Sequence, residues 1–313
     1  MLRNANRPTA LVATLLLGSG FCALAYQVVW FREFRLVFGA STAASAAVLA
    51  VFMGGIGLGG ALLGQKADKH PSPLRLYGWL ELGVAVAAAL SPALISLTQS
   101  AYIASGGQSV LGLWGATAAR LGLACVVLGL PTFLMGGTLP AAVRAATRED
   151  DRSRHATALL YGVNTLGAVL GAAMSTFVLL PAMSTHSVLW LACGLNTVVG
   201  LVAVLAAPRN EMTGAAVESG SSGAAAPQIT RSSRELPDFA PPEPAVLVYS
   251  AACVVGFAFF LMELVWYRML GPILGGTTYT FGLILVVALL GIGIGGALYS
   301  FVLRRVQPSA LGF

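Results

Sequence analysis

Few residues in this sequence could carry out chemistry inside its apolar stretches. The ionisable candidates there are Glu81, Arg120 and Glu263. By insertion scales, a charged side chain at the centre of a membrane helix costs about 2.5 to 3.5 kcal/mol, so each of these residues needs a structural or functional reason. Either acid could bind a cationic group. Arg120 has no acid beside it in the sequence and needs a partner from another helix, for which Glu81 and Glu263 are available.

The two acids differ in their surroundings. Glu263 stands where an earlier, similar stretch has Gln27, so a hydrogen-bonding group is kept at both positions and a charge is added at one. Glu81 follows Arg75 closely, near the start of its apolar stretch. Snorkelling of Glu81 toward water is therefore an alternative to a role in a cavity. Glu263 is the stronger candidate.

A Trp-x-Arg motif occurs twice, as Trp30-x-Arg32 and Trp266-x-Arg268. Tryptophans at these places are typical of interfacial anchors, although paired motifs could instead line a pathway. An asparagine inside an apolar stretch, such as Asn164 or Asn196, more often joins helices than binds a ligand. The candidate substrate-binding residues are Gln27, Trp30, Arg32, Glu81, Arg120, Asn164, Glu263, Trp266 and Arg268, and the candidate gating residues are Asp68 and Lys69.

The sequence predicts no catalytic residue, metal site or cofactor. No nucleophile stands near a candidate base, and the three histidines lack metal-ligand spacing. The four cysteines fall inside apolar stretches without paired spacing, so neither disulfides nor a zinc site is expected. Glycine runs at 55–60 and 291–296 resemble nucleotide-binding loops, but they are embedded in apolar segments. Pairs such as Gly55/Gly59 and Gly291/Gly295 are predicted to be close-packing seams between helices.

An internal repeat organises these positions. Residues 20–62 align without a gap onto 256–298, with sixteen of the 43 positions identical. Each copy is an apolar stretch that ends in Trp-x-Arg, followed by a Gly/Thr turn and a second apolar stretch. Two copies in the same direction predict a membrane protein with two parallel halves, as in many transporters.

Composition supports a membrane protein. Hydrophobic residues make up 57% and charged residues 10%, with a mean hydropathy of +0.82, whereas soluble proteins carry about 25% charged residues. The net charge of +6 is distributed between apolar runs, so it predicts orientation rather than nucleic-acid binding. Eight spans are predicted, at 9–31, 42–64, 76–98, 113–135, 156–180, 187–207, 246–267 and 279–302.

The basic residues predict the orientation of these spans. If the N-terminus is cytoplasmic, three arginines fall on the far side: Arg32, Arg35 and Arg268. The cytoplasmic side then holds Arg3, Arg7, Lys66, Lys69, Arg75, Arg144, Arg148, Arg152, Arg154, Arg209, Arg231, Arg234, Arg304 and Arg305. The positive-inside rule therefore predicts a bacterial inner-membrane protein with both termini in the cytoplasm.

The predicted organisation is a six-helix bundle at 1–207, a disordered cytoplasmic linker at 208–244, a helix pair at 245–305 that repeats 9–69, and a tail at 306–313. The linker is Gly/Ser-rich and then Pro-rich. The second copy thus has only the first two of six helices. Either the chain is a piece of a longer protein or its second half is reduced.

Several motifs carry a family resemblance. They are G-F-x-A-L-x-Y-Q-V-V-W-x-R at 20–32, F-M-G-G-x-x-L-G at 52–59, a turn M-G-G-T-L-P at 135–140, Y-G-V-N-T-L-G-A at 161–168, E-L-V-W-Y-R at 263–268 and G-G-T-T-Y-T-F at 275–281. Together they resemble the membrane region of bacterial spermidine synthase-like proteins, in which a major facilitator-like part is fused to a synthase. The resemblance implies an all-α, major facilitator-like fold of about eight transmembrane helices.

The resemblance also guides function. Such proteins usually carry an aminopropyltransferase-like domain, and no segment here has the strand, glycine loop and helix that it requires. The loop at 64–69 resembles a major facilitator signature, in which Asp68 would latch helix ends; a solvated loop is the alternative. Two functions stay open. One is a transporter-like domain that binds or moves a small solute such as a polyamine. The other is a non-transporting anchor or scaffold for a soluble aminopropyltransferase-like partner. In the transporter case, self-association of two chains would be needed to complete the pathway, because the second copy has only two helices.

Overall fold

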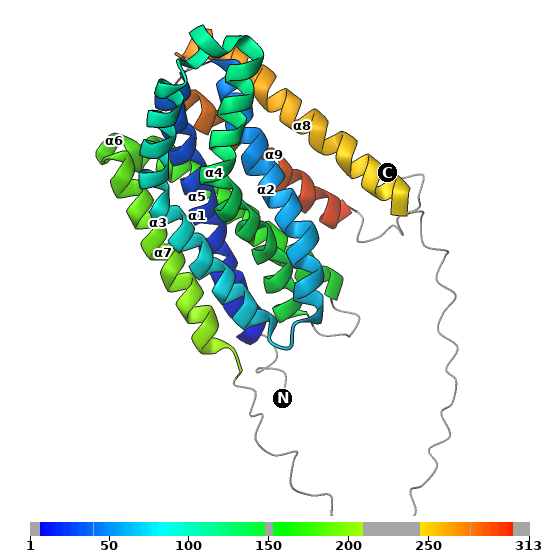
Figure 1. Ribbon diagram of the computed structural model, residues 1–313. Helices are drawn as coiled ribbons and strands as arrows, with labels where there is room; N and C mark the ends of the chain where they lie inside the picture. Colours follow the sequence, from blue (N-terminus) through cyan, green and yellow to red (C-terminus); the bar gives the residue numbers. More distant parts are fainter. Residues whose placement is uncertain (1–6, 40, 148–152, 209–244, 276, 303–313) are drawn as a thin grey trace, which may run out of the picture. The chain divides into compact units, whose positions relative to one another are not determined.

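The computed structural model describes residues 7–39, 41–147, 153–208, 245–275 and 277–302, and every regular element in these ranges is helical (Figure 1). The helices are α1 (Arg7–Phe38), α2 (Thr42–Lys69), α3 (Pro73–Ala104), α4 (Gly107–Ala146), α5 (Ser153–Met174), α6 (Leu180–Ala182), α7 (Thr185–Ala206), α8 (Ala245–Leu274) and α9 (Thr278–Val302). A π-helical turn, Ser175–Leu179, joins α5 to α6. Apart from Pro208, the predicted linker and tail lie outside the described residues.

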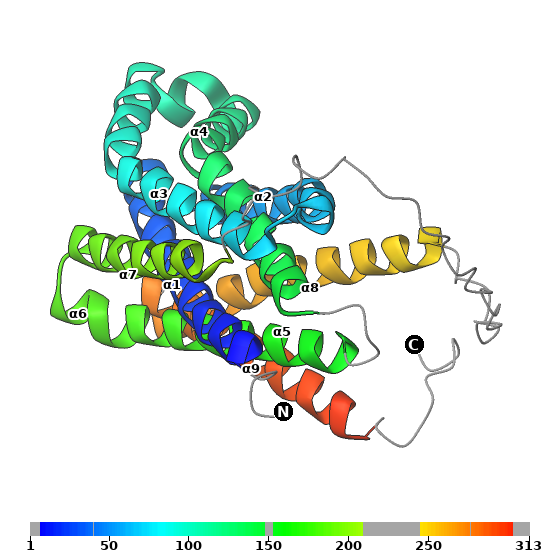
Figure 2. The same ribbon diagram turned by 90° about the horizontal axis from the view of Figure 1, so that it is seen from below.

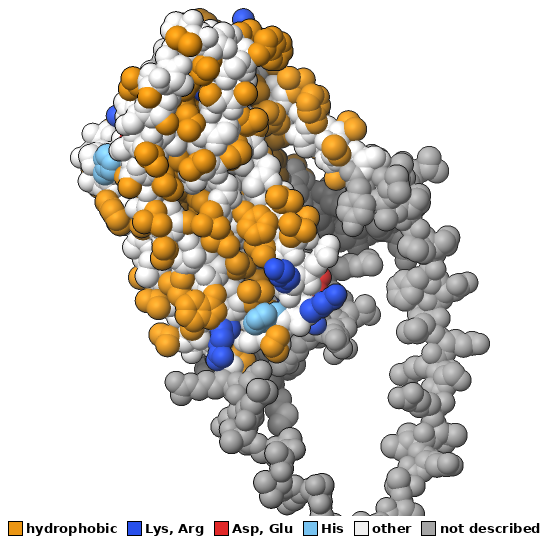
Figure 3. All heavy atoms as spheres, viewed as in Figure 1, with side chains coloured by type: hydrophobic (Ala, Val, Ile, Leu, Met, Phe, Trp, Pro, Cys, Tyr) orange, Lys and Arg blue, Asp and Glu red, His pale blue; other side chains and the backbone are white. Residues whose placement is uncertain are grey.

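Eight helical segments of the described chain are long and apolar enough to cross a membrane, as the sequence predicted. They are Thr9–Phe38, Thr42–Lys69, Pro73–Ala104, Gly107–Ala146, Thr157–Ala182, Thr185–Ala206, Ser250–Leu274 and Thr278–Gly296. Only helices and closed barrels satisfy their backbone hydrogen bonds within a bilayer. The chain is therefore a multi-pass membrane protein. Apolar side chains cover the face seen in Figure 3, and Lys and Arg side chains gather toward one end of it.

The chain divides into two compact units. The first comprises Met1–Ala207 and Leu261–Gln307, and the second comprises Pro208–Phe260 and Pro308–Phe313. In the second unit, the described residues are Pro208 and the first part of α8, which is helical. All contacts and pockets described below belong to the first unit.

Three helix pairs in the first unit are α1 with α5, α2 with α4, and α3 with α7, and α3 also packs on α4 as extensively as on α7. Figure 2 shows the bundle from one end, with α1 beside α3, α5 and α7. In the α2–α4 pair, a Cβ on Gly55 would collide with the Thr132 side chain, and one on Gly59 would collide with the Phe133 carbonyl. The predicted packing seam of the first copy is therefore confirmed, because only glycine allows these backbones to approach so closely.

The other two pairs are built in the same way. A Cβ on Gly167 or Gly171 of α5 would collide with the α1 backbone at Leu17 or Phe21. On α3, a Cβ at Gly78 would lie 2.8 Å from the carbonyl oxygen of Gly200 on α7. Small residues thus hold all three pairs together through backbone contact, as expected where lipid supplies no hydrophobic driving force between helices.

The two repeat copies have the same local structure. Helices α1 and α8 end at Phe38 and Leu274, and α2 and α9 begin at Thr42 and Thr278, which keeps the offset of 236 residues at both points. The intervening turns hold Gly39 and Gly275, each with a φ of +83°. Glycine is favoured there because other residues are strained at positive φ.

The packing partners of the two copies differ, and one prediction was wrong. Helix α2 packs on α4, whereas α9 packs on α5. A Cβ on Gly291 or Gly295 would meet nothing within 4 Å in the described structure, so these glycines form no seam there. At Gly282, helix α9 instead meets the π-helical turn that follows α5, where a Cβ would collide with the Thr176 side chain.

Two local predictions were also wrong. The segment 135–140 was expected to be a turn, but it lies within α4, which continues through Pro131 and Pro140. The segment 64–69 was expected to be a loop, but it forms the last turns of α2. Glycine, proline and charge predict turns in water. At 135–140, a bilayer instead favours an unbroken helix, because a freed backbone group has no water to bind.

Candidate functional site

The first candidate site is a cavity of about 360 Å³ between the helices of the bundle, here called the central cavity. Its walls come from α1, α2, α3, α4, α5 and α7, and its polar lining residues are Ser19, Tyr26, Glu81, Thr138, Asn164 and Asn196. The volume is within the usual range for small-molecule sites, which combine apolar walls with a few polar groups. Glu81 is the single ionisable carboxyl among the residues that line it.

Glu81 is held inside the bundle by three helices. Its side chain is 1% exposed, and the Ser19 hydroxyl donates a hydrogen bond of 2.6 Å to Oε1. The Asn196 side-chain amide donates a 2.7 Å bond to the Glu81 backbone carbonyl. These bonds connect α3 to α1 and α7. Snorkelling toward Arg75 or water is therefore wrong, because the carboxyl is turned toward the cavity and desolvated.

The other candidate substrate-binding residues of α1 do not line the central cavity. Gln27 is buried, and its amide nitrogen has no hydrogen-bond partner among the described residues. Trp30 is 1% exposed, stacks on Tyr26 with ring centroids 5.3 Å apart, and donates a 2.9 Å bond from Nε1 to Ser91 Oγ. The expectation of an interfacial anchor is wrong for Trp30. Trp266, at 37% exposure, lies at the surface.

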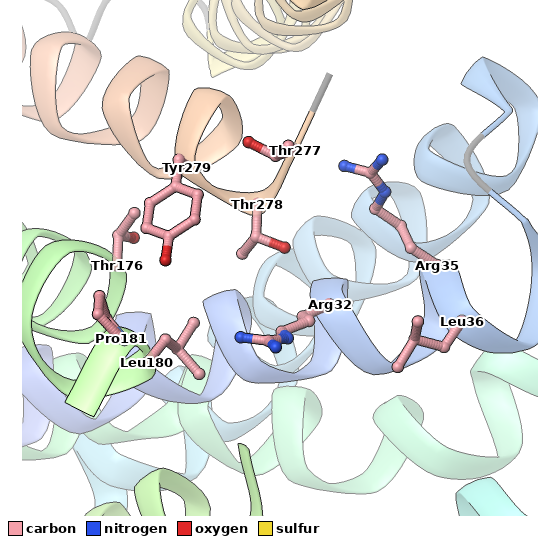
Figure 4. Close-up of a pocket in the computed structure, with 9 residues that line it drawn as sticks. All are labelled: Arg32, Arg35, Leu36, Thr176, Leu180, Pro181, Thr277, Thr278 and Tyr279. Atoms are coloured by element: carbon pink, nitrogen blue, oxygen red, sulfur yellow. The ribbon is translucent and has the colours of Figure 1, made fainter. Parts of the chain in front are cut away.

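A second site, here called the arginine pocket, lies beside the C-terminal part of α1 and has a volume of about 520 Å³ (Figure 4). Its lining residues are Arg32, Arg35, Leu36, Thr176, Leu180, Pro181, Thr277, Thr278 and Tyr279. It therefore combines two guanidinium groups with several hydroxyls, and none of its described lining residues is acidic. Arg268, the repeat counterpart of Arg32, is exposed and does not line it.

Aromatic side chains fix one of the two guanidinium groups. Arg35 donates a hydrogen bond to the Tyr267 hydroxyl, and its Cζ lies 5.8 Å and 5.6 Å from the Phe31 and Tyr267 ring centroids. Phe31 in turn stacks on Phe281 of α9, with centroids 3.7 Å apart. These contacts join α1, α8 and α9 behind the pocket and hold Arg35 in one place.

Arg120 does not pair with either buried acid, which corrects the sequence prediction. Its Nη2 donates a 3.1 Å bond to the side-chain carbonyl of Gln108 on the same helix, and its Cζ lies 5.7 Å from the Tyr102 ring centroid. The backbone break at Gly112, with a φ of +66°, separates Gln108 from Arg120 along α4. The guanidinium of Arg120 thus contacts Gln108 of α4 and the Tyr102 ring of α3, and not the acid that was expected.

Glu263 is buried without a partner. Its side chain is 1% exposed, and neither carboxyl oxygen accepts a hydrogen bond from any described residue. Leaving a buried polar group unsatisfied costs about 1 to 3 kcal/mol. The carboxyl at this position therefore opposes folding rather than supporting it.

Replacing Glu263 with methionine should accordingly raise the apparent melting temperature of the detergent-solubilised protein by several degrees. The substitution keeps the side-chain length and removes the unsatisfied carboxyl, and about 1 kcal/mol corresponds to 2 to 4 °C in a protein of this size class. Glu33→Met, at a partly exposed position, should change the melting temperature little. A marked decrease for Glu263→Met would instead mean that the carboxylate has a stabilising partner.

The predicted gate residues lie at the surface. Asp68 and Lys69 are exposed in the last turn of α2, and neither makes a hydrogen bond or an ion pair to another described residue. His70 ends the helix and accepts a 3.1 Å bond at Nδ1 from the Ser72 backbone. The latch implied by the major facilitator resemblance is not formed within the described chain.

Sequence reasoning missed several lining residues. Ser19 and Tyr26 were not singled out, although both line the central cavity. Asn196 was interpreted as a helix-joining residue, which the bond to Glu81 confirms, and it also faces the cavity. Thr176 gave no signal, since threonine is common in membrane helices. The Thr277-Thr278 pair was quoted only as part of a motif.

Comparison with known proteins returned no match: no family model, curated protein or solved structure is significantly similar to this chain. Among the described residues, no group of three or more His, Cys, Asp or Glu side chains could hold a metal ion. The central cavity offers a carboxyl, amides and hydroxyls, and the arginine pocket offers cationic and hydroxyl donors.

Proposed function

We propose that this chain is a transporter-like membrane domain that binds a small amine-bearing solute in the central cavity. The observation that carries the proposal is Glu81, a buried carboxyl that lines a cavity walled by six helices. An ammonium group can pair with a carboxylate and donate to the neighbouring amide oxygens. One carboxyl suits one ammonium group, so the site favours a monoamine or one end of a polyamine.

The architecture supports a transporter-like arrangement. The first six spans pair as first with fifth, second with fourth, and third with sixth. A two-fold rotation that exchanges the first three spans with the next three maps this set of pairs onto itself. Such an inverted 3+3 arrangement occurs within each half of a major facilitator transporter. The repeated pair α8–α9 would then begin a second, parallel half.

The family and location are proposed on the sequence motifs. Their resemblance to the membrane region of spermidine synthase-like proteins supports a polyamine as the solute. The exposed Lys66 and Lys69 at the end of α2 are on the predicted cytoplasmic side, which supports a bacterial inner-membrane protein with a cytoplasmic N-terminus. The lipid bilayer is then the chain's constant partner.

Thermal stability of the purified protein across a panel of amines tests the proposal. At about 100 times its Kd, a ligand that binds only the folded state contributes about 2.7 kcal/mol, which corresponds to an increase of about 5 °C. Spermidine, putrescine and simple monoamines should be compared with neutral analogues. We expect stabilisation by at least one amine in the wild type and none in Glu81→Gln, which keeps the size of the side chain.

Glu33→Gln is the matched control, because Glu33 is an acid of α1 that lines neither pocket. It should respond to amines as the wild type does. Equal responses of wild type and Glu81→Gln would contradict the proposal. No response to any amine would favour the alternative, a membrane anchor for a soluble aminopropyltransferase-like partner.

A further inference from the structure

We infer that the central cavity selects amines that also carry an uncharged hydrogen-bonding group, such as a hydroxyl or an amide. Asn164 of α5 is the residue that recognises this second group, and Glu81 of α3 holds the ammonium group. The inference rests on the amine site proposed above and specifies which amines that site takes. Three observations carry it: the free amide of Asn164, its position relative to Glu81, and the character of the remaining lining.

The two asparagines that line the cavity differ in their hydrogen bonds. Asn196 is 1% exposed, and its amide donates to the Glu81 backbone carbonyl, so it joins two helices. The Asn164 side chain is partly exposed and makes no hydrogen bond to any described residue. An amide can both donate and accept hydrogen bonds. Because Asn164 lines the cavity, both capacities are open to a solute there.

Helix α1 places the amide of Asn164 at the same depth in the bundle as the carboxyl of Glu81. Ser19 and Gly20 are consecutive on α1, and the Ser19 hydroxyl donates its 2.6 Å bond to Glu81. A Cβ on Gly20 would lie 3.1 Å from Asn164 Oδ1, so this amide sits against α1 where a side chain is missing. Successive helix residues point about 100° apart. The two polar groups therefore flank α1 on different sides and line the same cavity.

The rest of the lining suits an alkyl chain with an uncharged end. Its apolar side chains include Leu24, Ile56, Val84, Met135 and Leu139. None of the described lining residues is cationic. A carboxylate on the solute would therefore lack a counter-charge and would be repelled by an ionised Glu81. A hydroxyl or an amide can instead exchange hydrogen bonds with Asn164.

Binding of matched amines to the full chain in neutral detergent tests the inference. Ethanolamine and its longer homologues are compared with alkylamines and ω-amino acids of the same chain length. The concentration dependence of the apparent melting temperature gives each apparent affinity. We expect the wild type to bind the best amino alcohol at least about fivefold more tightly than the matched alkylamine, the effect of one additional hydrogen bond. The matched amino acid should bind no better than the alkylamine.

Asn164→Leu removes the amide and keeps a side chain of similar size. The preference for the amino alcohol should fall to within about twofold, because the hydrogen bond is lost, while the affinity for the alkylamine changes less than about twofold. Thr165→Val is the matched control. Thr165 is the next residue of α5, does not line the cavity, and donates its hydroxyl to the Tyr161 carbonyl. This variant should keep the full preference.

The outcomes separate this inference from the proposed function. Binding of amino alcohols and alkylamines with equal affinity would overturn the inference and leave the amine site intact. An unchanged preference in Asn164→Leu would do the same, as would an equal loss of affinity for both classes of amine. Failure of every amine to bind would overturn the proposed function and this inference together. If Asn164→Leu does not fold, Asn164→Ala only shortens the side chain, and an unchanged preference in that variant would overturn the inference.

Discussion

Replacing Gly59 with valine should destabilise the detergent-solubilised protein by about 3 kcal/mol or more, the upper end of what overpacking usually costs. The reason is the α2–α4 seam. A Cβ at Gly59 would collide with the carbonyl oxygen of Phe133 and lie 2.8 Å from its carbonyl carbon. Backbone cannot rotate away as a side chain can, so the two helices must separate. The measurement is the apparent melting temperature of purified protein.

The repeat supplies a matched control for this change. Gly295 is the counterpart of Gly59, and a Cβ there would meet no atom of the described structure within 4 Å. Gly295→Val should therefore leave the melting temperature within a few degrees of the wild type. Equal losses in the two variants would contradict the assigned packing and would mean that α9 also packs through its glycines.

Truncating Trp30 to alanine should destabilise the protein by about 3 to 5 kcal/mol, the usual cost for a large buried aromatic residue. Trp30 is 1% exposed, stacks on Tyr26 and lies 6.4 Å from Phe52, centroid to centroid. Its loss also leaves the Ser91 hydroxyl without its 2.9 Å donor. Thermal unfolding followed by light scattering or intrinsic fluorescence measures the effect.

Trp266 is again the counterpart in the repeat, and it is 37% exposed. Trp266→Ala should cost about 1 kcal/mol or less, since surface substitutions have small effects. If Trp266→Ala proved as damaging as Trp30→Ala, the two tryptophans would share one environment. The contrast between buried and exposed tryptophan would then be wrong.

The transmembrane segments could be predicted from the sequence because a bilayer imposes a length and a composition on each of them. All eight were found, and the repeat predicted the matching turns at Gly39 and Gly275. Turn propensities failed at 64–69 and at 135–140, and at 135–140 the reason is that these propensities describe competition with water. Within the hydrocarbon region, the cost of an unpaired backbone group exceeds the preference of glycine or proline for a turn.

The candidate site was harder to predict, because membrane helices are apolar on all sides and periodicity does not reveal which side faces a neighbour. Glu81 and Arg32 were identified by charge alone, and each lines a pocket. The partner of Arg120 was not found, because Gln108 joins it across a break in its own helix. The position of the Thr176 side chain depends on a π-helical turn that no sequence pattern predicted.

Helix α1 carries lining residues of both pockets, Ser19 beside Glu81 and, thirteen residues later, Arg32. At 1.5 Å per residue, the two positions are about 20 Å apart along the helix axis. An ionised Glu81 attracts cations, whereas Arg32 repels them. The bundle thus presents groups of opposite charge at two depths along a single helix.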